Sequence, residues 1–158
     1  MDRLWNPWRY QYVSKEHAST GCIFCDLPKE QNDEANLIVH RARFNFVILN
    51  LYPYTTGHLM VVPFQHTDSL QGVAEPTAQE LFSLVRTADR KLRDVYRPSG
   101  MNLGMNLGES AGAGIAEHIH MHVLPRWKGD ANFMSVIGET RILPEALAET
   151  YRKLKAVF

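Results

Sequence analysis

Runs of apolar residues in the first half of the chain predict three β-strands. The runs at 36–40 and 44–49 are joined by the short polar link 41–43, which indicates a hairpin. The stretch 50–57 interrupts the pattern with proline and glycine, and a third apolar run covers 58–63. We therefore expect three sequential strands, of which the first two form an antiparallel pair.

Two later segments have the spacing of amphipathic helices. The first runs from Ala78 to Tyr96, and Thr77 with Glu80 has the spacing of a capping box at its start. The second runs from Pro144 to about Lys155. The apolar stripe of the long helix indicates a face buried in the core and consists of Leu81, Leu84, Val85, Ala88, Leu92 and Val95.

Two further strands are expected between these helices. Residues 101–108 alternate between apolar and small or polar positions, a glycine-rich loop covers 109–114, and the sequence HIHMHVL follows at 118–124. The order of strands, helix, strands and helix predicts an α+β fold with a mainly antiparallel sheet. Residues 1–20 read as an irregular arm that packs on the body or on a partner subunit through its aromatic residues, Trp5, Trp8, Tyr10 and Tyr12.

Length and charge narrow the class of protein. The chain has 158 residues, of which 45% are hydrophobic and 22% charged, so we expect one globular domain over 1–158. Its formal net charge of zero argues against a nucleic-acid partner. No apolar stretch approaches the roughly 18 residues of a membrane span. The N-terminal residues also lack the apolar segment of a signal peptide, so we expect a cytoplasmic protein without a membrane partner.

The alternating histidines at 118–124 are the strongest indication of chemistry. In a strand, His118, His120 and His122 share one face while the apolar residues between them face the core. Neutral imidazole is a nucleophile, a metal ligand and a proton carrier near pH 7. The motif therefore indicates metal binding or chemistry on an anionic substrate, and a solvated strand face is the plain alternative.

Two cysteines form a Cys-x-x-Cys motif at Cys22 and Cys25. In a reducing compartment this motif indicates a metal site, a redox pair or two free thiols. The proline at position 28 argues against a thioredoxin-like helix that starts at Cys25. Zinc favours four Cys and His ligands, and His58, His66 or one histidine of the motif could complete the set.

The loop before the histidines is a candidate phosphate site. Glycine-rich backbone can approach a phosphate closely and present N–H groups to its oxygens. A flexible hairpin loop is the alternative, and the segment lacks the lysine of a Walker loop. Its candidate contacts are Asn106, Gly108, Ser110, Gly112 and Gly114.

Taken together, these motifs resemble the histidine triad (HIT) superfamily of nucleotidyl hydrolases and transferases. The sequence at 118–124 matches its His-φ-His-φ-His-φ-φ signature, and the flanking GHLMVVP at 57–63 agrees. NLYPY at 50–54 and PRWKGDANF at 125–133 look most like bacterial enzymes of the diadenosine tetraphosphate phosphorylase or hydrolase type. The resemblance implies the HIT-like fold, a purine nucleotide or dinucleoside polyphosphate as substrate, and a homodimer.

The resemblance also implies roles for individual residues. His120 would be the nucleophile that takes the nucleotidyl group from the α-phosphate, His122 would hold the phosphate, and His58 would sit beside them. Asn50 matches the position that holds the ribose hydroxyls. The apolar base pocket would consist of Ile23, Phe24, Leu27 and Ile48, for which ordinary core packing is the alternative.

For the metal, the resemblance implies one structural zinc ion bound by Cys22, Cys25, His66 and His118. It leaves open whether a divalent ion accompanies the polyphosphate. Several hydrolase members carry Gln or Ser four residues before the first histidine, where this sequence has Gly114, so backbone N–H groups or Ser110 would have to substitute.

Three other functions stay open at this point. One is a purine nucleoside phosphoramidase of the same superfamily, and another is a non-catalytic, zinc-stabilised nucleotide-binding module. The third is a catalytic metal site that uses all three histidines as ligands. Trp127 could reach either the substrate or a partner subunit.

Overall fold

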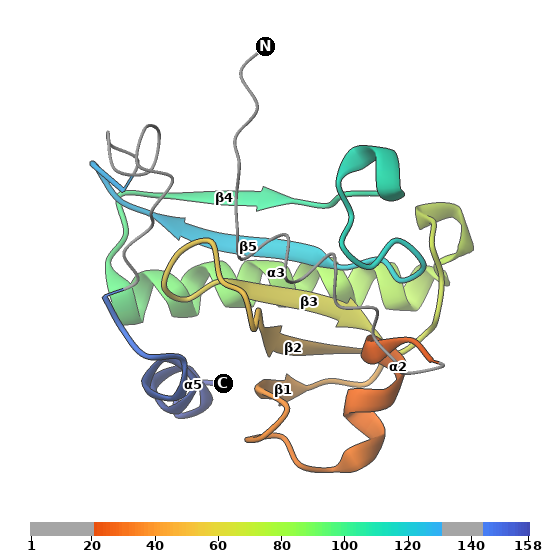
Figure 1. Cartoon of the computed structure of the whole chain (residues 1–158), viewed down its shortest axis with the longest axis horizontal. Coiled ribbons are helices and arrows are strands. Elements are labelled where there is room, and N and C mark those ends of the chain that lie inside the picture. The colour runs from red at the N-terminus through yellow and green to blue at the C-terminus, as the bar shows by residue number, and fades with distance from the viewer. Residues whose placement is uncertain (1–20, 131–143) are drawn as a thin grey trace.

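An antiparallel five-stranded sheet in the order β1-β2-β3-β5-β4 forms the centre of the protein (Figure 1). The computed structural model describes residues 21–130 and 144–158. This architecture confirms the predicted α+β class. The strands are β1 (Ile38–Arg41), β2 (Asn45–Leu49), β3 (Leu59–Pro63), β4 (Gly100–Gly104) and β5 (Met121–Arg126).

Two helices cover one face of the sheet and one of its edges. The long helix α3 (Glu75–Tyr96) crosses behind the sheet in Figure 1, and α5 (Leu147–Lys155) lies beside β1. Alternate strand residues face α3 because successive side chains point to opposite sides of a strand. The resulting α3-side core includes Val47, Leu49, Leu59, Val61, Leu84, Val85, Ala88, Leu92 and Val123.

The opposite face of the sheet carries a second core. Here α2 (Ile23–Asp26) and the 3-10 turn η1 (Leu27–Glu30) pack against the other set of strand residues. In this α2-side core the buried members are Phe24, Ile38, Phe46, Ile48, Met60 and Val62. Because Met60 pairs with His122 across β3 and β5, the histidine motif opens onto this second face.

The start of α3 differs from the prediction. The helix begins at Glu75, and its N-cap residue Ala74 makes no side-chain capping bond. Glu80 is not part of a capping box: its carboxylate accepts the backbone N–H groups of Arg43, Phe44 and Asn45 at 3.1, 2.7 and 2.9 Å. The acidic side chain thus fastens the β1–β2 turn to the helix.

Other boundaries also differ from the prediction, the largest differences being in the second half of the chain. The alternating run 101–108 forms a strand only as far as Gly104, and the 3-10 turn η3 (Glu109–Ala111) follows. The regular strand of the histidine motif begins at Met121. The C-terminal helix begins at Leu147 and not at Pro144.

Within the described residues, no helix is both long and apolar enough to cross a membrane. A further 3-10 turn, η2 (Leu70–Gly72), precedes α3. The predicted aromatic arm 1–20 lies outside the described residues, as does the segment 131–143.

Candidate active site and metal centre

Four histidines, from two neighbouring strands and the residues directly before them, are buried on the α2 side of the sheet. His118, His120 and His122 are 0%, 4% and 8% exposed, and His58, directly before β3, is fully buried. Ile119, between His118 and His120, and Val123, after His122, are also buried. Burying this many imidazoles is costly unless each ring has a partner, so their hydrogen bonds show how the site is built.

His58 and His122 are joined by a hydrogen bond of 2.8 Å between Nε2 of His58 and Nδ1 of His122. The other nitrogen of His58, Nδ1, accepts the backbone N–H of Tyr54 at 3.2 Å and faces the Asn50 amide at 3.3 Å. Since Nδ1 of His58 accepts, its proton sits on Nε2 and is donated to His122. His122 therefore carries its own proton on Nε2.

His120 is oriented by the main chain. Its Nδ1–H donates to the backbone carbonyl of His118 at 2.9 Å, which leaves Nε2 without a proton. The ring of His120 lies between those of Phe24 and His122, with centroid distances of 5.1 and 4.9 Å. The site thus offers an unprotonated ring nitrogen on His120 beside a ring N–H on His122.

Burial keeps these rings neutral. Together with the neighbouring His122 and His120, it lowers the pKa of His58 to about 3. Burial, followed by His120, lowers the pKa of His122 to about 4. It also lowers the pKa of His120, although the bond to the His118 carbonyl acts in the opposite direction. At neutral pH the rings are therefore available as nucleophile and hydrogen-bond donor.

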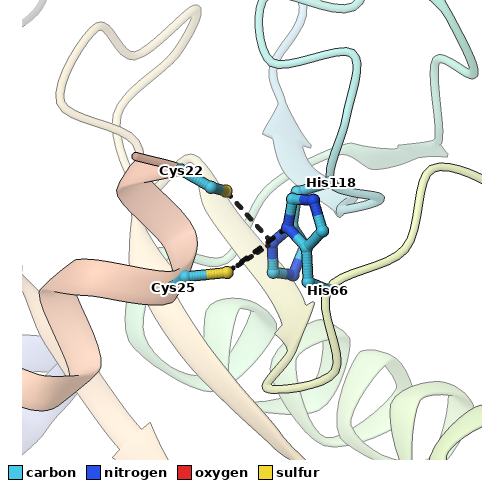
Figure 2. A group of neighbouring side chains, drawn as sticks. All are labelled: Cys22, Cys25, His66 and His118. Atoms are coloured by element: carbon cyan, nitrogen blue, oxygen red, sulfur yellow. Dashed lines mark hydrogen bonds between the residues drawn. The ribbon is translucent and has the colours of Figure 1, made fainter. Parts of the chain in front are cut away.

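A second group of side chains lies at the end of the sheet where β3 finishes. Figure 2 shows Cys22 and Cys25 on α2 pointing toward the rings of His66 and His118. Cys22 Sγ lies 3.2 Å from Nδ1 of His118, and Cys25 Sγ lies 3.3 Å from Nδ1 of His66. One ligand atom from each of the four residues lies within 4.8 Å of the others.

Local structure brings these four residues together. Cys22 is the N-cap of α2, and the N–H of Cys25 donates to its carbonyl at 2.9 Å, so the two thiols lie one turn apart. His66 follows β3, and the N–H of Ile119 donates to the carbonyl of Thr67 at 2.8 Å. This bond fixes the segment of His66 against the segment of His118.

The chemistry of the donor set fits zinc. Zinc favours tetrahedral sites of thiolate sulfur and imidazole nitrogen, whose ligand atoms lie about 3.5 Å apart. His118 Nε2–H donates to the Pro63 carbonyl at 2.9 Å, so its Nδ1 is unprotonated and faces the thiols, as a ligating histidine requires. Burial and the neighbouring Cys22 raise the pKa of the Cys25 thiol, so metal binding would release its proton.

The residues predicted for the base pocket lie together in the α2-side core, and Phe24 among them packs on the ring of His120. Phe24 and Ile48 are each 3% exposed in the α2-side core, and Ile23 and Leu27 pack against it half-buried. Phe24 contacts His118 as well as His120. This position agrees with both earlier interpretations, a base pocket and ordinary core.

Asn50 lies next to His58 and also accepts the N–H of Tyr52 at 3.0 Å. In the glycine-rich loop, the N–H groups of Ala111, Gly112 and Ala113 donate to carbonyls of the same loop. Asn106 and Gly108 are half-buried, whereas Ser110, Gly112 and Gly114 are exposed. Contact between this loop and a phosphate stays a prediction.

Two features of the site were not predicted from the sequence. The ring of Tyr54 lies 4.8 Å from that of His58. The backbone N–H of Tyr54 donates to Nδ1 of His58 and so places the ring proton of His58 on Nε2. The Pro63 carbonyl orients His118. The first could have been suspected from the aromatic run at 52–54, but the second is a main-chain group that no sequence pattern marks. Trp127 lies against Tyr96 of α3, at a centroid distance of 6.4 Å.

Comparison with known proteins gives consistent matches. The family model described as HIT domain matches residues 30–129. A Mycobacterium tuberculosis protein named AP-4-A phosphorylase is 41% identical, over 98% of this chain and 83% of its own length. The asymmetrical bis(5'-nucleosyl)-tetraphosphatase of Schizosaccharomyces pombe is 29% identical, over 59% of this chain and 50% of its own length.

Among solved structures, a zinc-bound histidine triad family protein from Mycobacterium smegmatis superimposes with a TM-score of 0.70. It is 27% identical, and the superposition covers 87% of this chain and 92% of that protein.

Proposed function

The chain belongs to the HIT domain family, and on that premise we propose that it is an enzyme that cleaves dinucleoside polyphosphates such as diadenosine tetraphosphate. The names of the Mycobacterium tuberculosis and Schizosaccharomyces pombe relatives support this substrate class. The observation that carries the proposal is the hydrogen-bond pattern of the buried histidines. It leaves one unprotonated nitrogen on His120 next to one N–H on His122.

In the first proposed step, Nε2 of His120 attacks the α-phosphorus. A P–N bond forms, the P–O bond to the rest of the polyphosphate breaks, and the leaving nucleotide departs with that oxygen. His122 donates its Nε2–H to the phosphate as negative charge develops, and His58 holds His122 in the correct tautomer. A covalent nucleotidyl group on His120 divides one difficult displacement into two easier ones.

In the second step, water or inorganic phosphate attacks the same phosphorus from the open side and releases the nucleotide from His120. Water gives hydrolysis and phosphate gives phosphorolysis. The name of the Mycobacterium tuberculosis relative favours phosphate as the acceptor.

The substrate is held by groups around His120. The half-buried and buried apolar residues of α2, η1 and β2 would contact the purine base, and Asn50 would contact the ribose. The glycine-rich loop before the histidines would contact phosphate. The base contacts proposed here are Ile23, Phe24, Leu27 and Ile48.

We also propose that Cys22, Cys25, His66 and His118 hold one structural zinc ion. The donor set, the free Nδ1 of His118 and the zinc-bound Mycobacterium smegmatis relative support this site. With four protein ligands, the zinc would have no open position for water and would serve to join α2 to the segment before β5.

A homodimer is proposed through β4. This strand is the edge of the sheet in the described part of the chain, and Leu103 and Leu107 along and after it are 51% and 42% exposed. An unpaired apolar strand edge is well suited to pairing with a second copy.

Product analysis tests the activity. Diadenosine tetraphosphate incubated with the enzyme and phosphate should yield ADP from the nucleotidyl group, whereas incubation without phosphate should yield AMP or no turnover. His120→Asn should lose at least about a thousandfold in kcat because the nucleophile is gone, while nucleotide binding measured by calorimetry persists. Turnover of adenosine phosphoramidate alone would instead identify a phosphoramidase, and substantial activity of His120→Asn would contradict the role of His120.

A further inference from the structure

We propose that Cys22 and Cys25 are a peroxide-reactive pair whose oxidation to a disulfide expels the zinc and releases the support of His120. The inference rests on the zinc site proposed above. It adds a modification site, with hydroperoxides as the class of reactant, to residues considered so far only as metal ligands.

Cys25 is reachable from solvent. It lines a surface cavity of about 460 Å³ together with Phe24, Pro28, Lys29, Arg41 and Phe64. His66, its partner at 3.3 Å, is exposed, and both cysteines are half-buried, with their sulfur atoms 3.2 and 3.6 Å from Nδ1 of the fully buried His118. A small oxidant can therefore reach Cys25 from this cavity, and Cys22 is the neighbouring thiol that would complete the disulfide.

The arrangement of the pair suits disulfide formation. Cys22 is the N-cap and Cys25 follows one helical turn later, with the sulfur atoms no more than 4.8 Å apart. Cys22 has extended backbone angles, φ −73° and ψ 122°, and lies at the open end of α2. Both cysteines belong to the first turn of a short helix, and a disulfide requires their sulfur atoms to approach to about 2.05 Å.

The chemistry balances with one peroxide. Cys25, which would be a thiolate because metal binding releases its proton, attacks a peroxide oxygen, so that an S–O bond forms, the O–O bond breaks and hydroxide leaves. The Cys22 thiolate then attacks the Cys25 sulfur, so that the S–S bond forms and the S–O bond breaks with loss of a second hydroxide. The two thiolates lose two electrons and the peroxide gains them. Only two neutral imidazoles would then remain as zinc ligands.

The consequence reaches the nucleophile through two contacts. The backbone carbonyl of His118, a proposed zinc ligand, accepts the Nδ1–H of His120 at 2.9 Å. Phe24 lies between the two cysteines in the sequence and packs on the rings of both His118 and His120. Movement of α2 and His118 on oxidation would therefore disturb the orientation of His120.

The experiment uses the full chain, purified in the reduced state, with its metal content measured first. Hydrogen peroxide is then added, and released zinc is followed with a chromogenic chelator while thiols and intact mass are recorded. The chain has only two cysteines, so every thiol lost belongs to this pair. We expect release of one zinc per chain, loss of both thiols and a mass lower by two hydrogen atoms, all reversed by a phosphine reductant with added zinc.

The matched variants are Cys22→Ser and Cys25→Ser. Cys22→Ser should trap a sulfenic acid on Cys25 that reacts with dimedone, and Cys25→Ser should label more slowly because it removes the thiol that lines the cavity. Zinc retained after peroxide, or thiols oxidised to oxygen adducts without a disulfide, would overturn this inference alone. A reduced protein that binds no zinc would overturn the zinc proposal, and the inference would fall with it.

Discussion

At the scale of single residues, the three histidines of the motif have identical side chains and three different surroundings. Nδ1 of His118 faces a thiol, Nδ1 of His120 donates to a carbonyl, and Nδ1 of His122 accepts from His58. In each ring the partner of one nitrogen decides what the other nitrogen can do. Their separate proposed roles follow from these partners and not from the motif itself.

The buried histidines should make the protein sensitive to mild acid. In the unfolded chain His58 and His122 have the ordinary pKa near 6.5, and in the folded protein the pKa values are about 3 and about 4. Their contribution is fully present above about pH 6.5 and is lost as the pH falls toward the folded values, because only the unfolded state takes up protons there. Each can lower the free energy of unfolding by up to about 1.4 kcal/mol per pH unit.

Urea unfolding between about pH 7 and pH 5 measures this slope, in a range where carboxylates contribute little. His58→Asn is the comparison, since it keeps every proposed zinc ligand and removes one titrating ring. The variant should show a shallower decline than the unaltered protein. Equal slopes would contradict the lowered pKa of His58.

At the scale of elements, the sequence predicts the strands and helices whose apolar positions recur with a clear period. The hairpin of β1 and β2, the strand β3 and the long helix α3 are confirmed because alternation or a helical stripe extends over several residues in each. The four-residue helix α2 was not predicted, since a single turn has no period to detect. The role of Glu80 was misread because its three N–H partners come from a turn 35–37 residues away in the sequence.

The same distinction applies to the site. The spacing of the histidines and cysteines marks them as candidates, and the family resemblance groups Cys22, Cys25, His66 and His118 as one ligand set. The groups that set the proton positions are the Tyr54 N–H and the carbonyls of Pro63 and His118. Every residue has such backbone groups, so no sequence pattern marks them.

Glu80→Gln should weaken the link between α3 and the β1–β2 turn. The carboxylate accepts three backbone N–H groups and the Asn45 amide, and an amide side chain cannot accept all of them. Leaving partly buried donors unpaired should cost about 1–3 kcal/mol in the free energy of unfolding, measured by urea denaturation. Glu75→Gln, an exposed position on the same helix, should cost no more than about 0.5 kcal/mol. Equal effects of the two substitutions would argue that Glu80 is not a tie between the elements.

At the scale of the whole molecule, the two edges of the sheet have different surroundings. The edge strand β1 is covered by α5, whose Tyr151 hydroxyl reaches the Ile38 carbonyl at 3.4 Å. In the described part of the chain no element pairs with the outer edge of β4. This difference is the basis of the proposed homodimer.

Leu103→Lys should therefore shift the protein from dimer to monomer. A charged side chain opposes strand pairing at an exposed edge. Sedimentation equilibrium measures the change, and at least a tenfold rise in the dissociation constant is expected. The control is Leu70→Lys on η2, a leucine of similar exposure at 58% against 51% for Leu103. A protein that is monomeric before substitution would contradict the dimer, and unchanged assembly of Leu103→Lys would exclude this edge.

The bond from His120 to the carbonyl of His118 has a consequence for how the site tolerates mutation. A nucleophile aligned by a carboxylate side chain can lose its alignment through one codon change at the partner, whereas every amino acid supplies this carbonyl. Genetic variation can break this bond only by redirecting the backbone, for example at Ile119, whose side chain is 2% exposed and whose N–H is bound to Thr67. A saturation mutagenesis screen should therefore find that activity is sensitive to substitution of Ile119, an aliphatic neighbour of His120 that takes no part in the chemistry.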